Sequence, residues 1–493
     1  MRISPLRAAA CLATCALTAC SGQESSVNVL LITVDTLRAD RLGCYGYERE
    51  TSPRIDAFAK EAVLFENAYS HAPFTAPSHA ALFTSLHNQG HGVTYWGQEI
   101  RDEVETFAER FRDAGWRTGA FYNMPVLEKC DVQQGFEEVQ LRYYEPADDT
   151  VDAFLEWAEA RSAAGESFAS WVHLWDVHRP YGFRDWDTEY LATRVDREDR
   201  TLAYEEERFG AAPDVRIGRT NNFYGLTEAK RKRVWNANGK KSQLGEADFR
   251  YIADRYDGGV WYADRALGDL FDGLRERGLL DETLVVLTSD HGETLMERES
   301  CYFHHDSFLF EETLKVPLII RFPDGWQGGT RIDPMARGID VLPTMLDVAN
   351  LPANGTLGRS LVPVIEGGDT RSEILLFAET VTPNVDAIQA EVEGKGPNWR
   401  EYRQLVFDGR LKLIHDTVQD RLFLYDLEQD PSEQTNVVDD ARYAEDVARL
   451  REKLASFNSM PAGAIDEGEM DSDLLQMLKD SGYIGDEPTD KGH

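Results

Sequence analysis

Two nearly continuous apolar runs, each closed by an aspartate, constrain the fold of this chain more than any other feature. The first is NVLLITVD (28–35), and the second lies within ETLVVLTSDHGE (282–293). Both are rich in β-branched residues and lack polar–apolar alternation, which is typical of strands buried on both faces of a parallel sheet. Because open α/β sheets bind ligands at the carboxyl ends of such strands, we expect Asp35 and Asp290 to lie at a functional site.

Further strands and helices are expected to alternate around these two runs. Apolar residues have helical spacing over 51–69 after a Ser-Pro start, and 248–280 has the pattern of a long amphipathic helix. RTGAFYN (117–123) and FASWVHLWD (168–176) are typical of strands. This alternation predicts an α/β fold.

The pattern changes near residue 371. Short alternating runs separated by turn residues, such as QLVFDGRLKLIHD, predict antiparallel strands, and an amphipathic helix is expected at about 441–457. We therefore expect a catalytic domain over 27–370 and a smaller α+β subdomain over 371–460. The acidic segment 461–493 is expected to be a surface tail.

Residues 183–247 form a charged stretch within the expected catalytic domain. They contain the basic cluster KRKR (230–233). Charge runs are usually solvated faces, so a solvated insertion is the simpler interpretation, and a loop that contacts substrate is the alternative.

The first nineteen residues are typical of an export signal. Two arginines precede an apolar stretch too short to span a bilayer, and LTAC (17–20) resembles the bacterial lipobox. We expect 1–19 to be removed, Cys20 to be lipidated and 20–26 to be a tether, so that the exported protein is held at a bacterial membrane, facing the periplasm or the cell surface, through lipid alone. An ordinary secretory signal ending at the same place is the alternative.

Composition excludes some partners and frameworks. The formal net charge of −35 disfavours nucleic acid as a partner. Three of the six cysteines fall in the signal region, which leaves Cys44, Cys130 and Cys301 with no CxxC spacing. This arrangement argues against a disulfide framework and a zinc knuckle, so buried thiols are expected, with one bridge possible.

A series of motifs extends from residue 28 to about 485. In chain order, they are NVLLITVDTLRADRLGCYGY, TAPSHAALFTS with GHGV, HLWDVHRPY, YDGGVWYADRALGDLFDGLRERGLLDETLVVLTSDHGE, HHDSFLFEETLKVPLIIR, LVFDGRLKLI with LFLYDLEQDPSEQTN, and LKDSGYIG. Together they resemble the bacterial sulfatase-type hydrolases of the alkaline phosphatase superfamily. The resemblance implies a mixed sheet sandwiched by helices, a smaller C-terminal α+β subdomain with an antiparallel sheet and a helix, and one divalent cation.

The resemblance implies a metal site with a changed nucleophile. Asp35, Asp290 and His291 match metal ligands, and their oxygen-rich set admits Ca, Mg, Mn or Zn. Thr75 matches the nucleophile position, where sulfatases carry a Cys or Ser oxidised to formylglycine, and it would also bind the cation. The second acid of the usual pair after the first strand is replaced by Thr36.

Four other positions match residues that contact the ester. His79 replaces the Arg of the CxPSR signature, which reads TAPSH here, and Asn123 lies near the place of a family Lys. Both are expected to hold anion oxygens, although His79, one turn into a helix, has the alternative of pointing away from the site. His178 and His305 match histidines at the ester or leaving-group oxygen and would protonate that oxygen.

Three functions remain open. A Thr nucleophile lacks the second hydroxyl with which formylglycine hydrate expels sulfate, so hydrolysis of phosphate mono- or diesters through phospho-threonine is favoured. The alternatives are a sulfuric ester hydrolase acting on sulfated glycans or aryl sulfates, and a catalytically weak lipoprotein that binds anions or glycans. In each case the partner is an anionic small molecule, lipid headgroup or glycan.

Overall fold

The computed structural model describes most of the chain between residues 27 and 459. The predicted signal peptide, Cys20 and the tether lie outside the described residues, as do Cys301, KRKR and most of the charged insertion and acidic tail. The described residues are 27–143, 145–179, 181, 234–235, 241–242, 246–298, 305, 308–371, 373–383, 400–459, 473 and 477.

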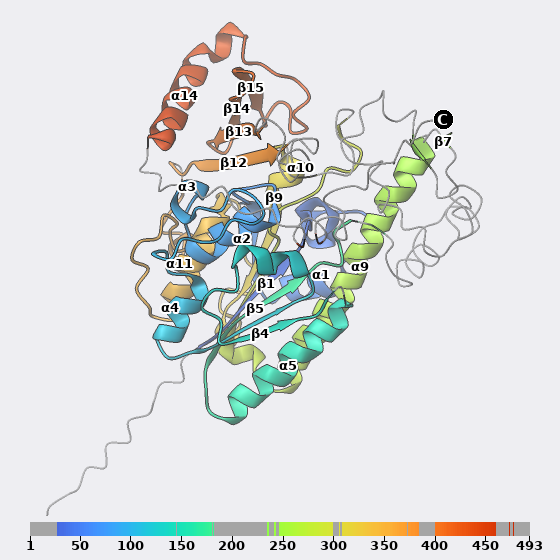
Figure 1. Cartoon of the computed structure of the whole chain (residues 1–493), viewed down its shortest axis with the longest axis vertical. Coiled ribbons are helices and arrows are strands. Elements are labelled where there is room, and N and C mark those ends of the chain that lie inside the picture. Colours follow the sequence, from blue (N-terminus) through green and yellow to red (C-terminus); the bar gives the residue numbers. More distant parts are fainter. Residues whose placement is uncertain are drawn as a thin grey trace, which may run out of the picture.

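A nine-stranded mixed sheet forms the centre of the larger part (Figure 1). Its central strand β1 (Asn28–Val34) is parallel to both β5 (Phe168–Leu174) and β8 (Thr283–Thr288). All residues of these three strands are buried, which confirms the prediction from the two apolar runs. The strand order is β10 (Arg331–Ile332), β2 (Val63–Tyr69), β9 (Lys315–Arg321), β8, β1, β5, β3 (Arg117–Tyr122) and β4 (Glu138–Leu141), with β11 (Ala336–Arg337) also paired to β2.

The prediction of one helix over 51–69 is wrong in its second half. Helix α1 covers only Pro53–Ala59, and Val63–Tyr69 forms strand β2, antiparallel to β9. Val63, Leu64 and Phe65 are all buried, and they pair with an equally apolar stretch of β9. The consecutive apolar residues VLF suit a strand covered on both faces, and this tertiary burial outweighs the helical spacing.

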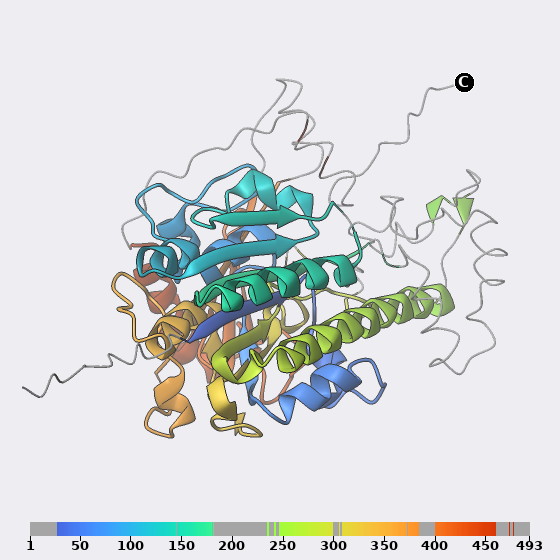
Figure 2. The same ribbon diagram turned by 90° about the horizontal axis from the view of Figure 1, so that it is seen from below.

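Alternate residues of β1 enter two different cores, one on each face of the sheet. Leu30 and Ile32 pack with α1, α5 (Ala147–Ala163) and α9 (Glu246–Glu276). Val29 and Leu31 pack in the core covered by α2 (Thr75–Thr84), α4 (Phe107–Asp113) and α11 (Val341–Val348). Figure 2 shows the long helix α9 running beside α5 along one face. The shorter helices are α3 (Asn88–His91), α10 (Glu311–Leu314) and α12 (Val362–Ile365).

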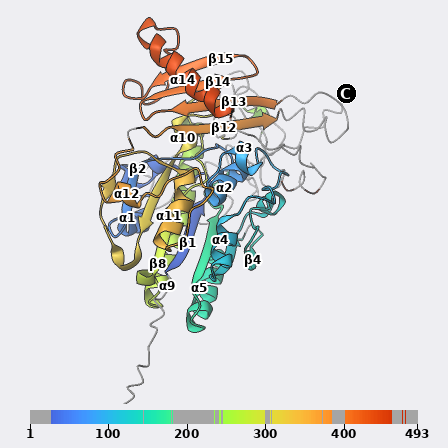
Figure 3. The same ribbon diagram turned by 90° about the vertical axis from the view of Figure 1, so that its left-hand side faces the viewer.

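A four-stranded antiparallel sheet follows the catalytic region, as the sequence predicts (Figure 3). Helix α14 packs on one face of this sheet through Leu450, Leu454 and Phe457. The other face contributes Leu376 and Phe407 to a core that includes residues of the catalytic region. The elements are β12 (Leu376–Pro383), β13 (Arg400–Phe407), β14 (Leu411–Asp416), β15 (Arg421–Asp426) and α14 (Ala444–Asn458).

Two of the three cysteines that follow the signal region lie within the described residues. Cys44 and Cys130 are free thiols, and Cys130 is buried as expected, whereas Cys44 is only partly buried. Burial raises the pKa of the Cys130 thiol to about 12.

Across the described ranges, every helix is too short or too polar to cross a membrane. Two short strands, β6 (Val234–Trp235) and β7 (Lys241–Ser242), are described within the charged insertion.

Candidate active site

The ends of β1 and β8 bring together the three side chains predicted as metal ligands. One ligand atom from each of Asp35, Asp290 and His291 lies within 4.8 Å of the others, and all three side chains are buried. The backbone N–H of Asp35 donates to Leu174 O at the end of β5, which fixes the turn where β1 ends. The meeting of strand ends predicted from the sequence is therefore present, and it produces a cluster of two carboxylates and one imidazole.

This cluster suits a divalent cation. Oδ1 of Asp290 accepts the backbone N–H groups of Thr36 (3.2 Å) and His291 (2.9 Å), whereas Oδ2 accepts no hydrogen bond from any residue that the structure describes. Burial raises the pKa of Asp290, but His291 and the other imidazoles nearby outweigh it, so the net shift of this pKa is downward. An ionised, buried carboxylate oxygen needs compensating positive charge, and carboxylate and imidazole ligands supply a site for it.

Thr75 is the first residue of α2, directly beside this cluster. The helix begins there because Phe74 has extended backbone angles (φ −154°, ψ 134°) and Pro77 falls in the first turn. Thr75 Oγ1 lies 3.1 Å from His291 Nε2. Ser78 Oγ donates to the backbone O of Asp290 (2.5 Å), which fastens α2 to the end of β8. The positive end of the helix dipole, which favours anions, therefore faces the metal-ligand cluster.

His79 points into the site and not toward the helix surface. Its Nδ1 lies 2.8 Å from Thr75 O and 3.8 Å from Asp290 Oδ2, and its Nε2 lies 3.2 Å from Thr33 Oγ1. Both ring nitrogens therefore have protein partners. In this arrangement His79 orients the start of α2, and the contact with substrate that the sequence suggests stays a prediction.

Three imidazoles form a row that starts beside Thr75. The ring centres of His291 and His305 are 4.6 Å apart, and those of His305 and His178 are 5.1 Å apart. Nδ1 of His305 lies 3.0 Å from Oε1 of Glu293. Burial, followed by the neighbouring His305 and Arg179, lowers the pKa of His178 well below its usual value. The structure thus brings both predicted acid–base histidines into one row with His291, the residue that contacts Thr75.

Asn123 makes three hydrogen bonds to the surrounding chain. Its amide donates to Glu145 O (2.9 Å) and to Oδ2 of Asp176 (2.9 Å), and its carbonyl accepts the backbone N–H of Trp175 (2.8 Å). These bonds fasten the turn that leads to His178. The predicted role of Asn123 in holding substrate stays a prediction, and the geometry gives it a role in positioning this turn.

Two residues of the site were not predicted from the sequence. His173 lies inside β5 with Nε2 3.5 Å from Oδ2 of Asp35, and Glu293 orients His305. His173 is the first residue of the HLWDVHRPY motif, but it also continues an apolar run, and the parallel pairing of β1 with β5 is what places it opposite Thr33. Glu293 stands three residues after Asp290 in SDHGE, where its charge is the available signal.

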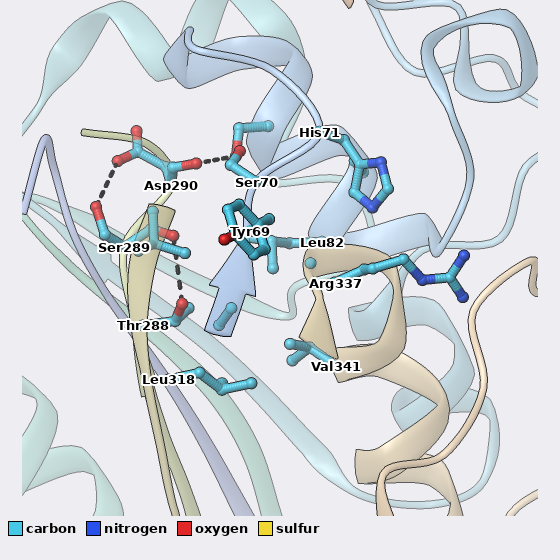
Figure 4. A pocket seen from close by; sticks show the side chains of 15 residues that line it. Tyr69, Ser70, His71, Leu82, Thr288, Ser289, Asp290, Leu318, Arg337 and Val341 are labelled. Carbon is cyan, nitrogen blue, oxygen red and sulfur yellow. Dashed lines mark hydrogen bonds between the residues drawn. The ribbon is translucent and has the colours of Figure 1, made fainter. Parts of the chain in front are cut away.

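A small cavity lies behind the start of α2. Figure 4 shows Asp290 and Ser289, at the end of β8, facing the loop that carries Ser70 and His71. Apolar side chains such as Leu82 complete its lining. His71 is held there by a contact of 2.7 Å between its Nδ1 and Phe377 O of β12. The cavity is therefore lined both by Asp290 and by His71, which contacts the C-terminal sheet.

Known proteins share this sequence pattern and this fold. The Sulfatase family model matches residues 27–351. An arylsulfatase of Clostridium perfringens (strain 13 / Type A) is 22% identical over 472 residues, covering 87% of this chain and 93% of the relative.

Two solved structures share the fold at a TM-score of 0.68. The phosphonate monoester hydrolase of Agrobacterium radiobacter is 22% identical, with 88% of this chain and 96% of the other covered. BT4656, in complex with its substrate D-glucosamine-2-N,6-O-disulfate, is 21% identical, with 88% and 99% covered. Because the family model spans well over half of the sequence, the chain belongs to the sulfatase family and is an ester hydrolase of that family.

Proposed function

We propose that this protein is a cation-dependent hydrolase of phosphate mono- or diesters that uses Thr75 as its nucleophile. The observation that carries this proposal is the position of Thr75 Oγ1, at the first residue of α2 and 3.1 Å from Nε2 of the metal-ligand residue His291. A hydroxyl at this position is beside the cation site and the positive end of the helix at once. Both lower the pKa of a hydroxyl.

Asp35, Asp290 and His291 would hold the cation. When bound, a divalent cation there supplies positive charge that stabilises an alkoxide and neutralises the ester oxygens. Thr75 Oγ1 gives its proton to a solvent water and attacks phosphorus in line, forming the Oγ–P bond as the bond to the leaving oxygen breaks. The N–H groups at the start of α2 face the oxygens that carry the developing charge.

The histidine row protonates the leaving oxygen. The carboxylate of Glu293 accepts the Nδ1–H of His305, which leaves the Nε2 of His305 to deliver the proton, beside His178. The Nε2 of His305, which has just given up its proton, then takes a proton from a water molecule as that water attacks phosphorus, and Thr75 Oγ1 departs and recovers a proton from solvent. No aldehyde is required, because this second step breaks the P–O bond and not a C–O bond.

Sulfate esters are the second candidate substrates. The Clostridium perfringens relative is an arylsulfatase, and BT4656 has a disulfated sugar as its substrate. The phosphonate monoester hydrolase shares the fold to the same TM-score as BT4656, so the fold itself does not favour sulfur over phosphorus. Thr75 does favour phosphorus, because a Thr ester of sulfate lacks the elimination route of formylglycine hydrate.

A panel of esters on matched variants tests the proposal. Aryl phosphate, aryl phosphodiester, phosphonate monoester and aryl sulfate would be assayed with the full-length protein loaded with Mn²⁺, Mg²⁺, Ca²⁺ or Zn²⁺. We expect Thr75→Ala to lose about 1000-fold or more in kcat, as for removal of a nucleophile, while Thr75→Ser keeps measurable turnover. The control is Thr84→Ala at the far end of the same helix, where Thr84 Oγ1 donates to Ala80 O (2.6 Å) and accepts the backbone N–H of Leu86 (3.3 Å).

Each outcome separates the candidates. Phosphoryl–Thr75 trapped by acid quench and found by mass spectrometry would support the covalent route. Full turnover by Thr75→Ala would show that Thr75 is not the nucleophile. Turnover of the sulfate exceeding that of every phosphorus ester would replace the proposal by the sulfate candidate. Tight glycan binding without cleavage of any ester would support a binding protein.

A further inference from the structure

The turn that follows β1, residues 36–38, is held by side chains from two other parts of the fold. Each of its three backbone N–H groups donates to a side-chain oxygen. The pairs are Thr36 with Oδ1 of Asp290 (3.2 Å), Leu37 with Oγ of Ser289 (3.0 Å) and Arg38 with the hydroxyl of Tyr256 (3.0 Å). Two of these acceptors lie at the end of β8, and the third comes from the long helix α9.

Tyr256 holds this turn at two points. Its hydroxyl donates to the backbone oxygen of Thr36 (2.7 Å) and accepts the backbone N–H of Arg38 (3.0 Å). A phenol hydroxyl can donate and accept at the same time. One oxygen atom therefore joins the two peptide groups on either side of Leu37, which prevents the turn from rotating.

The position of this hydroxyl is set by the hydrophobic core. Tyr256 is fully buried, in the same core as Leu30 and Ile32 of β1. Its ring also packs edge-on against Tyr181, with the ring centres 5.8 Å apart. Because side chains in a close-packed core have little room to move, the hydroxyl is a fixed point to which the turn is attached.

The turn requires such support because of Thr36. With a φ of 57°, this β-branched residue has a left-handed conformation, which persists only where the surrounding structure imposes it. The N–H of Thr36 binds the carboxylate of Asp290, and Asp35 directly precedes it in the chain. If Thr36 relaxed to an ordinary conformation, both carboxylates would move.

We propose that Tyr256 is a positioning residue for the cation site: its hydroxyl holds the strained turn at Thr36, and thereby the two carboxylate ligands, in place before a cation is bound. Residues that orient metal ligands affect the affinity for the metal although they do not touch it. The inference rests on the cation site of the proposed function, but not on which ester is cleaved. It can therefore be tested by cation binding alone.

Tyr256→Phe removes the hydroxyl and keeps the ring in the core. Full-length protein would be titrated calorimetrically with Mn²⁺, Mg²⁺, Ca²⁺ and Zn²⁺. For the cation that wild type binds most tightly, we expect Tyr256→Phe to bind about 10- to 100-fold more weakly.

The matched control is Tyr262→Phe in the same helix. Tyr262 is also buried, and its hydroxyl donates to Oδ2 of Asp148 in α5 (3.0 Å). Both variants lose a hydroxyl of a buried tyrosine, so the Tm of the cation-free protein should fall in both. Only Tyr256→Phe is expected to lose cation affinity, which separates a positioning role from a contribution to stability.

Hydrogen exchange in the wild-type protein gives a test that needs no variant. In the cation-free protein, peptides that cover 36–38 are expected to exchange their amide hydrogens as slowly as those of β1, because the turn is already held. Rapid exchange of the three amides would mean that the turn forms only when a cation binds, and it would overturn the inference.

The binding results separate this inference from the proposed function. Equal cation affinity in folded Tyr256→Phe and Tyr262→Phe would show that the hydroxyl of Tyr256 does not position the ligands, and it would leave the proposed function standing. Wild-type protein that binds none of the four cations would overturn both.

Discussion

At the scale of single residues, Thr36 shows how tightly the end of β1 is constrained. Its φ of 57° is in the left-handed region, which is costly for a β-branched residue. Its backbone N–H nevertheless donates to Oδ1 of Asp290, and its hydroxyl donates to the backbone oxygen of Asp35. The strained turn therefore holds the two carboxylates of the cation site in their relative positions.

A second single residue, His71, should make stability depend on pH. Burial, followed by the charge of Arg337, lowers the pKa of His71 to about 3 from its usual 6.5. Below pH 6.5 the unfolded state binds a proton at His71, whereas the folded state does so only near pH 3. The contribution of His71 to stability is therefore complete above pH 6.5 and falls on acidification. The expected loss is about 1.4 kcal/mol for each pH unit below 6.5, or about 2 kcal/mol at pH 5.

His71→Gln is expected to reduce this dependence. Calorimetric melting at about pH 7 and about pH 5 would give a smaller difference in Tm for the variant than for wild type. His415→Gln serves as the control, because His415 lies on the C-terminal sheet and contacts the exposed Asp420. An equal pH difference in His71→Gln and wild type would show that another group causes the acid sensitivity.

At the scale of elements, the site depends on how closely α9 approaches the turn after β5. A Cβ atom at Gly259 of α9 would lie 2.9 Å from the backbone oxygen of Asp176 and 3.2 Å from Cα of Val177. This is the turn that carries His178. The glycine, costly within a helix, is thus required for a close backbone contact with the turn that carries His178, which we propose as an acid–base residue.

Gly259→Ala is expected to displace this turn and lower kcat by about 10- to 100-fold, because small misplacements of catalytic groups are costly. The matched control is Gly268→Ala in the same helix, whose added Cβ meets only the side chain of Arg54, which can move. Steady-state kinetics on both variants, with circular dichroism to confirm folding, would check this. Equal kcat in the two variants would mean that the contact at Gly259 does not position His178.

The same elements show what sequence reasoning can and cannot predict. The ends of β1 and β8 were identified correctly because apolar runs closed by Asp are a local signal. Strand β2 was predicted as helix because its burial comes from β9, some 250 residues away. His173 was missed for a similar reason, since its place beside Asp35 follows from the register of β1 with β5 and not from its neighbours in sequence.

At the scale of the whole molecule, buried charges join the C-terminal sheet to the catalytic region. Lys412 of β14 is buried and contacts Glu311 of α10 (2.6 Å) and Glu433 (2.9 Å). Arg298 bridges Glu312 (2.6 Å) and Glu433 (3.2 Å). The alternating pattern of the sequence predicts the C-terminal subdomain. It does not predict this ionic contact, because the charges involved are far apart in the chain.

Replacing Lys412 tests whether this contact holds the two parts together. Burial lowers the pKa of Lys412, but the two carboxylates outweigh it and raise the pKa, so the lysine is charged. Lys412→Met leaves buried carboxylates without their cation and should lower the free energy of unfolding by about 3–5 kcal/mol. Denaturant unfolding would measure the loss, against Arg442→Met, which removes an exposed pair with Asp440. Since neither residue lies in the active site, kcat at low temperature should remain that of wild type; unchanged stability in Lys412→Met would mean that the apolar core between the two parts suffices to hold them.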